Sequence, residues 1–209
     1  MRANFSFVRN CRGLKGLNPD EFASLLMAED RKVWQNAEEI LQQLGITEGM
    51  TVADLACGPG YFTLPMARLV GGSGTVYAVD SSSTMLKHLK QNVTKGLPID
   101  LRKTIVLMEN DVTRTEIPEN SVDVILMANI IHDLEDVRSF SMEVKRILKP
   151  QATAVDIDWH KRETESNGPP LQRRLSEDES RNLLTENGFR VKKAIYAGPY
   201  HYGLVLGLS

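Results

Sequence analysis

The sequence predicts an α/β domain: a doubly wound, mostly parallel sheet of seven strands with a C-terminal antiparallel hairpin. From residue 51 onward, short apolar runs alternate with segments in which apolar residues recur every three or four positions. The C-terminal stretch 189–208 consists of two apolar runs around Gly198-Pro199, which indicates a hairpin. Glycine and aspartate stand at the predicted strand ends, where doubly wound sheets bind their ligands.

Two helices are predicted before the first strand. The first begins at Asn18-Pro19, because asparagine caps helices, proline suits the first helical position, and Glu21 completes a capping box. The second ends at Gly45 and is predicted from apolar residues that share one face: Val33, Ala37, Ile40, Leu41 and Leu44. The basic residues before Asp20 favour a solvated tail, with a lid over an anionic ligand as the alternative: Arg2, Arg9, Arg12 and Lys15.

The remaining elements alternate. Strands are predicted at 51–56, 75–79, 104–108, 122–129 and 153–159. A helix is predicted at 61–70, and another from the apolar residues Met85, Leu86, Leu89 and Val93. A third helix is predicted from the apolar stripe Val137, Phe140, Val144, Ile147 and Leu148, and it ends before Pro150. The fourth begins at the capping box Ser176–Glu179 and ends at Gly188.

Composition restricts the function classes. With 209 residues, 42% of them hydrophobic, and a net charge of −2, the chain is expected to form about one globular domain without a strong field for nucleic acid. We expect no secretory signal and no membrane span, and therefore a cytoplasmic protein. The two cysteines, Cys11 and Cys57, cannot form a disulfide framework or a four-cysteine zinc site, and the four histidines are scattered, so no metal site is predicted.

A glycine loop follows the first strand. Gly58 and Gly60 let a ligand approach the backbone closely, and the next helix aims unsatisfied N–H groups at the same space. The spacing departs from the dinucleotide-binding fingerprint, since Thr63 stands where its third glycine would follow Gly58 and Gly60.

Carboxylates follow this loop at the next strand ends. Asp80 ends the second strand and can accept hydrogen bonds from ribose hydroxyls, and Asp111 follows the third and can accept from an exocyclic amine. Each alone could equally cap a helix or a turn. Together with Asp54 and the glycine loop, they indicate a nucleoside-containing ligand.

These segments resemble the class I S-adenosylmethionine-dependent methyltransferases over about residues 46–149. VADLACGPGYF and VYAVD look like the family's first two motifs, and ENDVTRTEIPENSVDVILM is similar to the third and fourth together. IIHDL and VKRILKP look like the branch that contains the ubiquinone/menaquinone and arsenite methyltransferases. Gln151-Ala152 departs from the two glycines usual after KP, and the scarcity of cysteine argues against arsenite as a substrate.

The resemblance implies a Rossmann-like methyltransferase fold, S-adenosyl-L-methionine as cofactor, and a place for each matching residue. Asp54, Ala56, Gly58 and Gly60 would surround the methionine portion; Asp80, with Ser81 and Met85, the ribose; Asp111 and Val112 the adenine; and Asn129 the methionine amine or sulfonium. We expect residues 1–45 to form a tail and helices that cover the active site, and residues 46–209 to form the S-adenosylmethionine-binding domain.

Methyl transfer needs a base only when the acceptor must lose a proton. We predict that His132, after the fourth strand, and Asp158, at the end of the fifth, line the acceptor pocket as catalytic residues, with Trp159 as an aromatic wall. His132 could instead bond to backbone, and Asp156 and Asp158 could pair with Lys161, Arg162 or a neighbouring helix. His201 reads as ordinary strand alternation, and Cys57 as a small packed residue.

The leading reading is therefore a methyltransferase for a small-molecule acceptor, with a homodimer left open. RNA or protein as the acceptor, or a non-catalytic scaffold that binds the cofactor, are the alternatives. An NAD-dependent oxidoreductase is disfavoured by Thr63.

Overall fold

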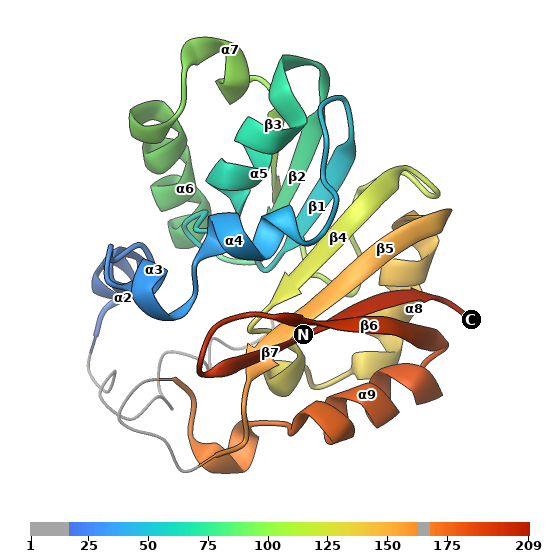
Figure 1. The fold of residues 1–209 in the computed structure, drawn as a ribbon. Coiled ribbons are helices and arrows are strands. Elements are labelled where there is room, and N and C mark those ends of the chain that lie inside the picture. Colours follow the sequence, from blue (N-terminus) through green and yellow to red (C-terminus); the bar gives the residue numbers. More distant parts are fainter. Residues whose placement is uncertain (1–16, 163–167) are drawn as a thin grey trace.

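A computed structural model describes residues 17–162 and 168–209; the predicted basic tail and Cys11 lie outside these ranges. The described chain forms one seven-stranded sheet in the order β3-β2-β1-β4-β5-β7-β6 (Figure 1). The strands are β1 (Thr51–Leu55), β2 (Thr75–Asp80), β3 (Ile105–Glu109), β4 (Val122–Ala128), β5 (Leu148–Trp159), β6 (Phe189–Tyr196) and β7 (His201–Leu208). Neighbouring strands from β3 to β5 pair in parallel, and β7 pairs antiparallel with both β5 and β6. The predicted fold class is confirmed.

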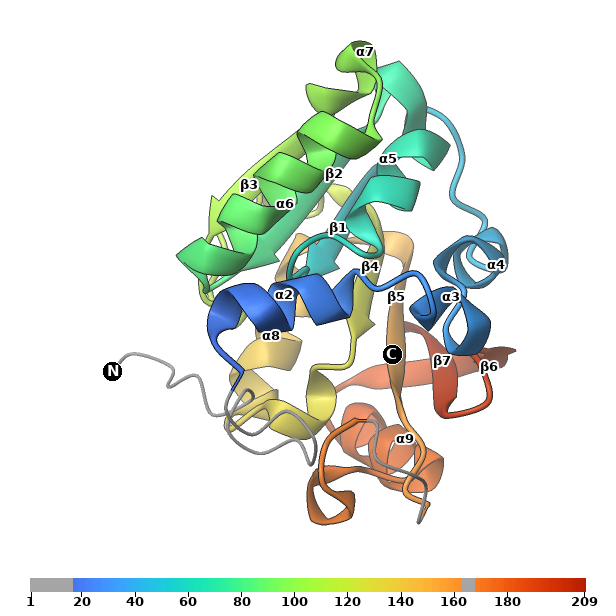
Figure 2. The ribbon, with the colours of Figure 1, turned by 90° about the vertical axis from the view of Figure 1, so that its left-hand side faces the viewer.

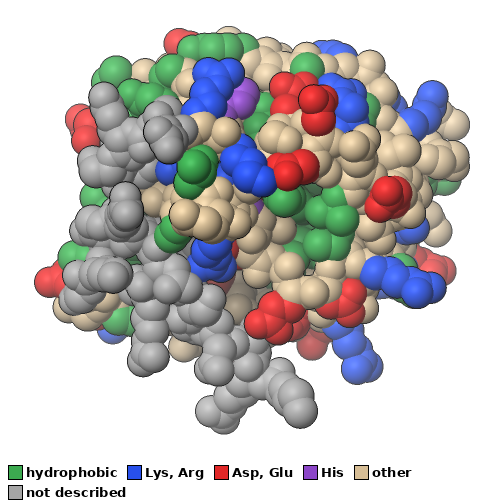
Figure 3. Space-filling view, turned by 90° about the horizontal axis from the view of Figure 1, so that it is seen from below, with side chains coloured by type: hydrophobic (Ala, Val, Ile, Leu, Met, Phe, Trp, Pro, Cys, Tyr) green, Lys and Arg blue, Asp and Glu red, His purple; other side chains and the backbone are tan. Residues whose placement is uncertain are grey.

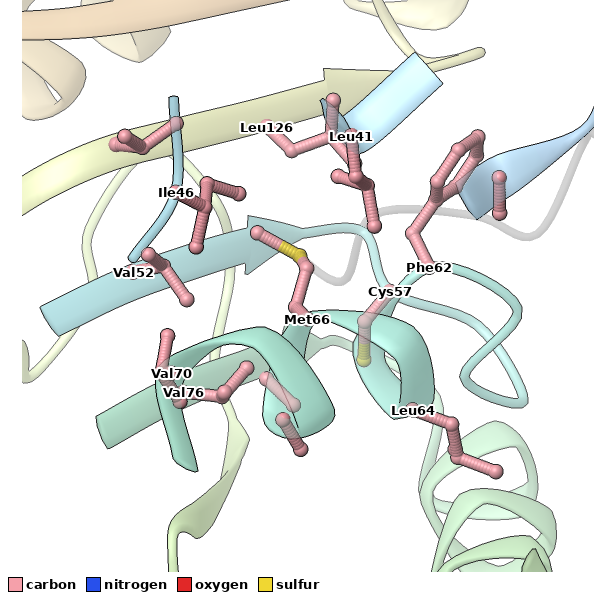
Figure 4. Close-up of a cluster of buried hydrophobic side chains, with 14 of the residues drawn as sticks. Leu41, Ile46, Val52, Cys57, Phe62, Leu64, Met66, Val70, Val76 and Leu126 are labelled. Atoms are coloured by element: carbon pink, nitrogen blue, oxygen red, sulfur yellow. The ribbon is translucent and has the colours of Figure 1, made fainter. Parts of the chain in front are cut away.

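Helices cover both faces of the sheet. Buried apolar side chains on one face of the sheet come from α4 (Ala37–Gln42), α5 (Thr63–Val70) and α6 (Ser83–Gly96). Those on the other face come from α8 (Val137–Ile147) and α9 (Glu177–Glu186). Figure 2 shows α5 and α6 side by side in front of β2 and β1. Figure 4 shows the first cluster, in which Met66 of α5 lies between Val52 of β1 and Leu41 of α4. Two short helices, α3 (Arg31–Trp34) and α7 (Ile99–Arg102), are also present.

The first predicted helix is confirmed as α2 (Pro19–Leu26). The Asn18 side chain accepts hydrogen bonds from the backbone N–H groups of Asp20 and Glu21. The Glu21 carboxylate in turn accepts from the Asn18 backbone N–H, as the capping box predicts. Phe22 and Ala23 then pack against Met85 of α6. This contact holds α2 at the carboxyl edge of the sheet, beside the glycine loop (Figure 2).

The second predicted helix is wrong as a single helix. It breaks into α3 and α4 because the Asn36 side chain accepts from the N–H groups of Glu38 and Glu39 and so caps a new helix. Val33 is 85% exposed and does not share the buried face of Ile40 and Leu41. The break turns the end of α3 toward the sheet edge.

The strand order reverses between β1 and β4, since the chain runs outward from β1 to β3 and then returns to the other side of β1. Such a reversal leaves a crevice beyond the carboxyl ends of the two strands, where ligands of doubly wound sheets bind. The helices α2 and α3 lie along this edge in Figures 1 and 2. In the parts of the chain that the structure describes, every helix is too short or too polar to cross a membrane.

Candidate active site

The loop after β1 has a backbone that requires glycine. Ala56, Gly58 and Gly60 all have positive φ, of 60°, 54° and 98°. A Cβ added at Gly60 would lie 2.3 Å from Leu89 Cδ1, so a side chain at that position would collide with α6. Ala56 adopts the left-handed conformation despite its methyl group, which is consistent with its place where the resembled family usually has glycine.

Asp80 fixes this loop to the end of β2. Its Oδ2 accepts from the Gly58 N–H at 2.8 Å, and its Oδ1 accepts from the Ser82 N–H at 2.8 Å. Burial raises the pKa of the Asp80 carboxyl above its ordinary value. Ser81, beside it, is exposed, and Met85 is buried beneath α2. The structure therefore brings Asp80 and the glycine loop together, as predicted from their positions at neighbouring strand ends.

Asp54 lies deeper, inside β1. It is 2% exposed, and its Oδ2 accepts from the Thr63 hydroxyl at 2.6 Å, across the start of α5. Burial raises the pKa of the Asp54 carboxyl to about 7, with the Thr63 hydrogen bond acting in the opposite direction. Without a cationic ligand nearby, ionisation of the Asp54 carboxyl is therefore unfavourable.

Asp54→Asn should stabilise the ligand-free protein at alkaline pH. Because the folded-state pKa of Asp54 is raised, the native state binds the extra proton, and stability falls as the pH rises from about 4 to about 7. An asparagine lacks this ionisation, so we expect its free energy of unfolding at pH 8 to exceed that of wild type by roughly 4 kcal/mol. Urea unfolding of both proteins at pH 8 and pH 5 measures this difference. If the difference in free energy of unfolding is as large at pH 5 as at pH 8, the raised pKa of Asp54 is contradicted.

Asn129 and Gln35 meet at the end of β4. Asn129 has φ 60°, donates its backbone N–H to the Ile157 carbonyl at 2.7 Å, and points its Nδ2 at Gln35 Oε1, 3.5 Å away. Gln35, which ends α3, is fully buried. Among the described residues, Gln35 Nε2 and Asn129 Oδ1 have no hydrogen-bond partner. A buried donor and a buried acceptor side by side without partners indicate a site that a ligand completes.

Arg31 sets the orientation of the Gln35 amide. Its Nε and Nη2 donate to Gln35 Oε1 at 3.1 and 2.7 Å, so this atom is the carbonyl oxygen and Nε2 is the free donor. The guanidinium lies 3.9 Å from the centre of the Tyr61 ring, and the Tyr61 hydroxyl donates to the backbone carbonyl of Gln35 at 2.5 Å. Burial lowers the pKa of Arg31 to about 10, which still leaves a cation at neutral pH.

Sequence reasoning missed Gln35, Arg31 and Tyr61. The one local signal was the Asn36 cap, which ends α3 and places Gln35 at a helix terminus rather than on an outer helical face. Nothing in the spacing of residues 31–35 indicates that this turn meets the end of β4.

The predicted catalytic pair does meet. His132 Nδ1 lies 2.7 Å from Asp158 Oδ1, and the His132 backbone N–H donates to Asp158 Oδ2 at 3.2 Å. The Nε2 side faces Asp133, whose Oδ1 is 3.3 Å away, and Asp133 forms an ion pair with Arg173. Burial disfavours the imidazolium, but the charges of Asp158 and Asp133 outweigh it, so the pKa of His132 lies above its ordinary value.

Asp156 has a separate environment. It lies on the same face of β5 as Asp158, is fully buried, and accepts from the Ser180 hydroxyl of α9 at 2.7 Å. Burial raises the pKa of Asp156 well above its ordinary value. The expected pairing with a neighbouring helix thus applies to Asp156, whereas Lys161 pairs with Glu179.

Asp111 is exposed and bonds within its own loop. Its Oδ1 accepts from both the N–H and the hydroxyl of Thr113, at 2.8 and 2.7 Å, as a turn-stabilising aspartate does. Val112 packs partly against the core on the α8 side of the sheet. Neither residue contacts the Asp80–Gly58 cluster through a hydrogen bond.

Cys57 is buried in the glycine loop as a free thiol, and burial raises its pKa, so it has the character of a packed residue rather than a nucleophile.

A depression of about 370 Å³ lies on another part of the surface, between the N-terminal helices and α5. It shares Tyr61 with the site but contains none of the predicted site residues.

Comparisons with known proteins agree with this geometry. Residues 53–155 match the family described as "Methyltransferase domain". A crystal structure of an S-adenosylmethionine-dependent methyltransferase from Aquifex aeolicus is 31% identical, covers 92% of this chain and 100% of its own, and superposes with a TM-score of 0.84. A 2-phytyl-1,4-naphtoquinone methyltransferase of Nostoc punctiforme is 30% identical over 142 residues, and a demethylmenaquinone methyltransferase of Staphylococcus aureus is 24% identical over 139.

The sheet order, the glycine loop and the strand-end carboxylates define a class I methyltransferase domain. This chain belongs to the S-adenosylmethionine-dependent methyltransferases. The segment matched to the Nostoc relative spans 68% of this chain and 60% of that relative. The segment matched to the Staphylococcus relative spans 66% of this chain and 54% of that relative. This chain therefore covers less than two thirds of either relative.

Proposed function

We propose that this protein transfers a methyl group from S-adenosylmethionine to a small-molecule acceptor that loses a proton in the reaction. The observation that carries the proposal is the buried His132–Asp158 pair at the carboxyl ends of β4 and β5, beside Asn129. A transfer to an acceptor without an acidic proton needs no such pair.

The residues at the sheet edge fit the donor. The unpartnered Gln35 Nε2 and Asn129 Oδ1 offer one donor and one acceptor, which suits the carboxylate and ammonium of an amino acid. We assign Asp80 to the ribose hydroxyls, since a carboxylate that accepts two backbone N–H bonds retains further lone pairs. Bound there, S-adenosylmethionine supplies an electrophilic methyl group on a positively charged sulfur.

Further contacts are assigned by position. We place the methionine portion against Asp54, Ala56, Gly58 and Gly60, with Ser81 and Met85 beside the ribose. Asp111 and Val112 are assigned to the adenine, because Asp111 Oδ2 has no hydrogen bond within the described chain and could accept from an exocyclic amine.

His132 is the proton acceptor in this proposal. Asp158 holds the Nδ1 side and fixes the ring, and the proton is taken at Nε2. Asp133 and Arg173 flank that side, so the acceptor hydroxyl would displace or share the contact with Asp133. Asp158 acts as a positioning residue, because it contacts the base and not the acceptor.

Three observations favour a small molecule over RNA or protein. The relatives named above are quinone methyltransferases by name. The N-terminal helices bring buried side chains, Gln35 and Arg31, onto the sheet edge, which supports residues 17–45 as part of a cover. On the visible part of the face in Figure 3, Lys and Arg side chains are interspersed with Asp and Glu rather than gathered in a basic patch.

Methyl-labelled S-adenosylmethionine tests this function with a matched pair of acceptors under anaerobic conditions. We expect labelled product from 1,4-dihydroxynaphthalene and none from 1,4-dimethoxynaphthalene, whose hydroxyls are blocked. Equal labelling of both compounds, or labelling confined to added RNA or protein, contradicts the proposal.

A further inference from the structure

Three aromatic rings from distant parts of the sequence meet beside the His132–Asp158 pair. Trp34 comes from α3, Trp159 ends β5, and His201 begins β7. Ring centres are 4.1 Å apart for Trp159 and His201, 5.7 Å for Trp34 and His201, and 5.6 Å for the two tryptophans. We call these residues the three-ring cluster.

His201 is the unexplained member of this cluster. It is 2% exposed, and neither Nδ1 nor Nε2 has a hydrogen-bond partner in the described part of the chain. A neutral imidazole carries one donor and one acceptor, and burial of either without a partner destabilises the folded protein. A phenylalanine would fill the space without that cost, so packing alone does not account for the imidazole.

Two guanidinium groups lie near the rings of the cluster, and the Asp158 carboxylate lies 2.7 Å from the Trp159 backbone nitrogen. The Arg174 guanidinium lies 5.3 Å from the centre of the Trp159 ring, and the Arg31 guanidinium lies 5.8 Å from the Trp34 ring. Burial, with Arg31 next in effect, lowers the pKa of His201 well below its ordinary value. The His201 ring is therefore neutral and offers an N–H donor, and the two nearby guanidinium groups favour a negatively charged partner.

The cluster is adjacent to both halves of the proposed site. Trp159 follows Asp158, Trp34 precedes Gln35, and β5 pairs with β7 so that Trp159 faces His201. The close approach of the β6–β7 turn to α3 maintains this arrangement, since a Cβ at Gly198 would lie 2.0 Å from the Trp34 carbonyl oxygen. Trp34 is half-buried and gives the cluster access to solvent.

We propose that the three-ring cluster recognises the methyl acceptor, a flat aromatic molecule with an ionised hydroxyl, through ring contacts and a hydrogen bond from His201 to the oxygen. Aromatic side chains favour stacked or edge contacts with another ring. A hydrogen bond to a charged oxygen is stronger than one to a neutral oxygen. The inference rests on the proposed function, because the ionised hydroxyl is the product of proton removal by His132.

The two tryptophans of the sequence are both in the cluster, so tryptophan fluorescence reports on this site alone. The probes are 2-hydroxy-1,4-naphthoquinone, which carries an acidic hydroxyl, and 2-methoxy-1,4-naphthoquinone, in which that hydroxyl is blocked. We expect saturable quenching by the hydroxy probe in the wild-type protein, with correction for its absorption. Trp34→Phe and Trp159→Phe each remove part of the signal.

His201→Phe should weaken binding of the hydroxy probe at least tenfold and binding of the methoxy probe less than threefold. His201→Gln keeps an N–H donor and should retain most of the affinity; His88→Phe, a change on α6, should leave it unaltered. Absence of saturable quenching, equal loss of both probes in His201→Phe, or equal loss in the Phe and Gln variants overturns the proposal.

These outcomes separate this inference from the proposed function. Probe binding that depends on His201, together with turnover that is unchanged in His132→Ala, contradicts the base while supporting the cluster. Turnover that depends on His132, with probe binding indifferent to His201, contradicts the cluster alone.

Discussion

Asp80→Asn should weaken S-adenosylhomocysteine binding by about 10- to 100-fold. The carboxylate accepts from Gly58 N–H and Ser82 N–H with different oxygens. An asparagine presents an NH₂ group on one side, so one backbone donor would face another donor and lose its partner. Charge-assisted bonds of this kind contribute about 1.5–3 kcal/mol each, and the ribose contacts are lost as well.

Isothermal titration calorimetry measures this effect. Asp100→Asn, an exposed aspartate on α7, is the matched control and should bind as wild type does. Asp80→Asn that folds normally and binds within threefold of wild type would place the nucleoside elsewhere.

His132→Ala should reduce turnover by about 10²- to 10⁴-fold, the range for loss of a general base, with S-adenosylhomocysteine affinity changed by less than threefold. Asp158→Asn should also reduce turnover, because asparagine cannot hold the imidazole in the same charged pair. His88→Ala is the control, since His88 pairs with Asp20 on the outer side of α6 and α2.

The pH dependence distinguishes a base from a structural histidine. Asp158 and Asp133 stabilise the imidazolium and Arg173 opposes it, so turnover should rise with pH through a pKa above the ordinary histidine value. Asp158→Asn removes the larger of the two stabilising charges and should lower that pKa. Histidine NMR titration gives the same pKa without an acceptor; a His132 resonance unmoved by Asp158→Asn contradicts the assignment.

The sequence allowed the sheet and the meeting of Asp80, Gly58, His132 and Asp158 to be predicted. Parallel strands bring their carboxyl ends to one edge, so position in the chain determines which side chains meet. The prediction that His132 and Asp158 lie together needed only the neighbouring places of β4 and β5.

Contacts between the N-terminal helices and the sheet edge could not be predicted in this way. Gln35 and Trp34 reach the edge because Asn36 breaks the helix, and the apolar spacing of Val33 and Ala37 instead suggested one continuous helix. His201 looked like ordinary strand alternation because its burial depends on α3, which is far away in the sequence.

A crystal structure with S-adenosylhomocysteine tests the account most directly. We expect the ribose hydroxyls on Asp80, the glycine loop of Gly58 and Gly60 against the ligand, and the amino-acid end on Gln35 Nε2 and Asn129 Oδ1. A nucleoside bound elsewhere, for example in the depression between the N-terminal helices and α5, with both amides still unpartnered, would contradict it.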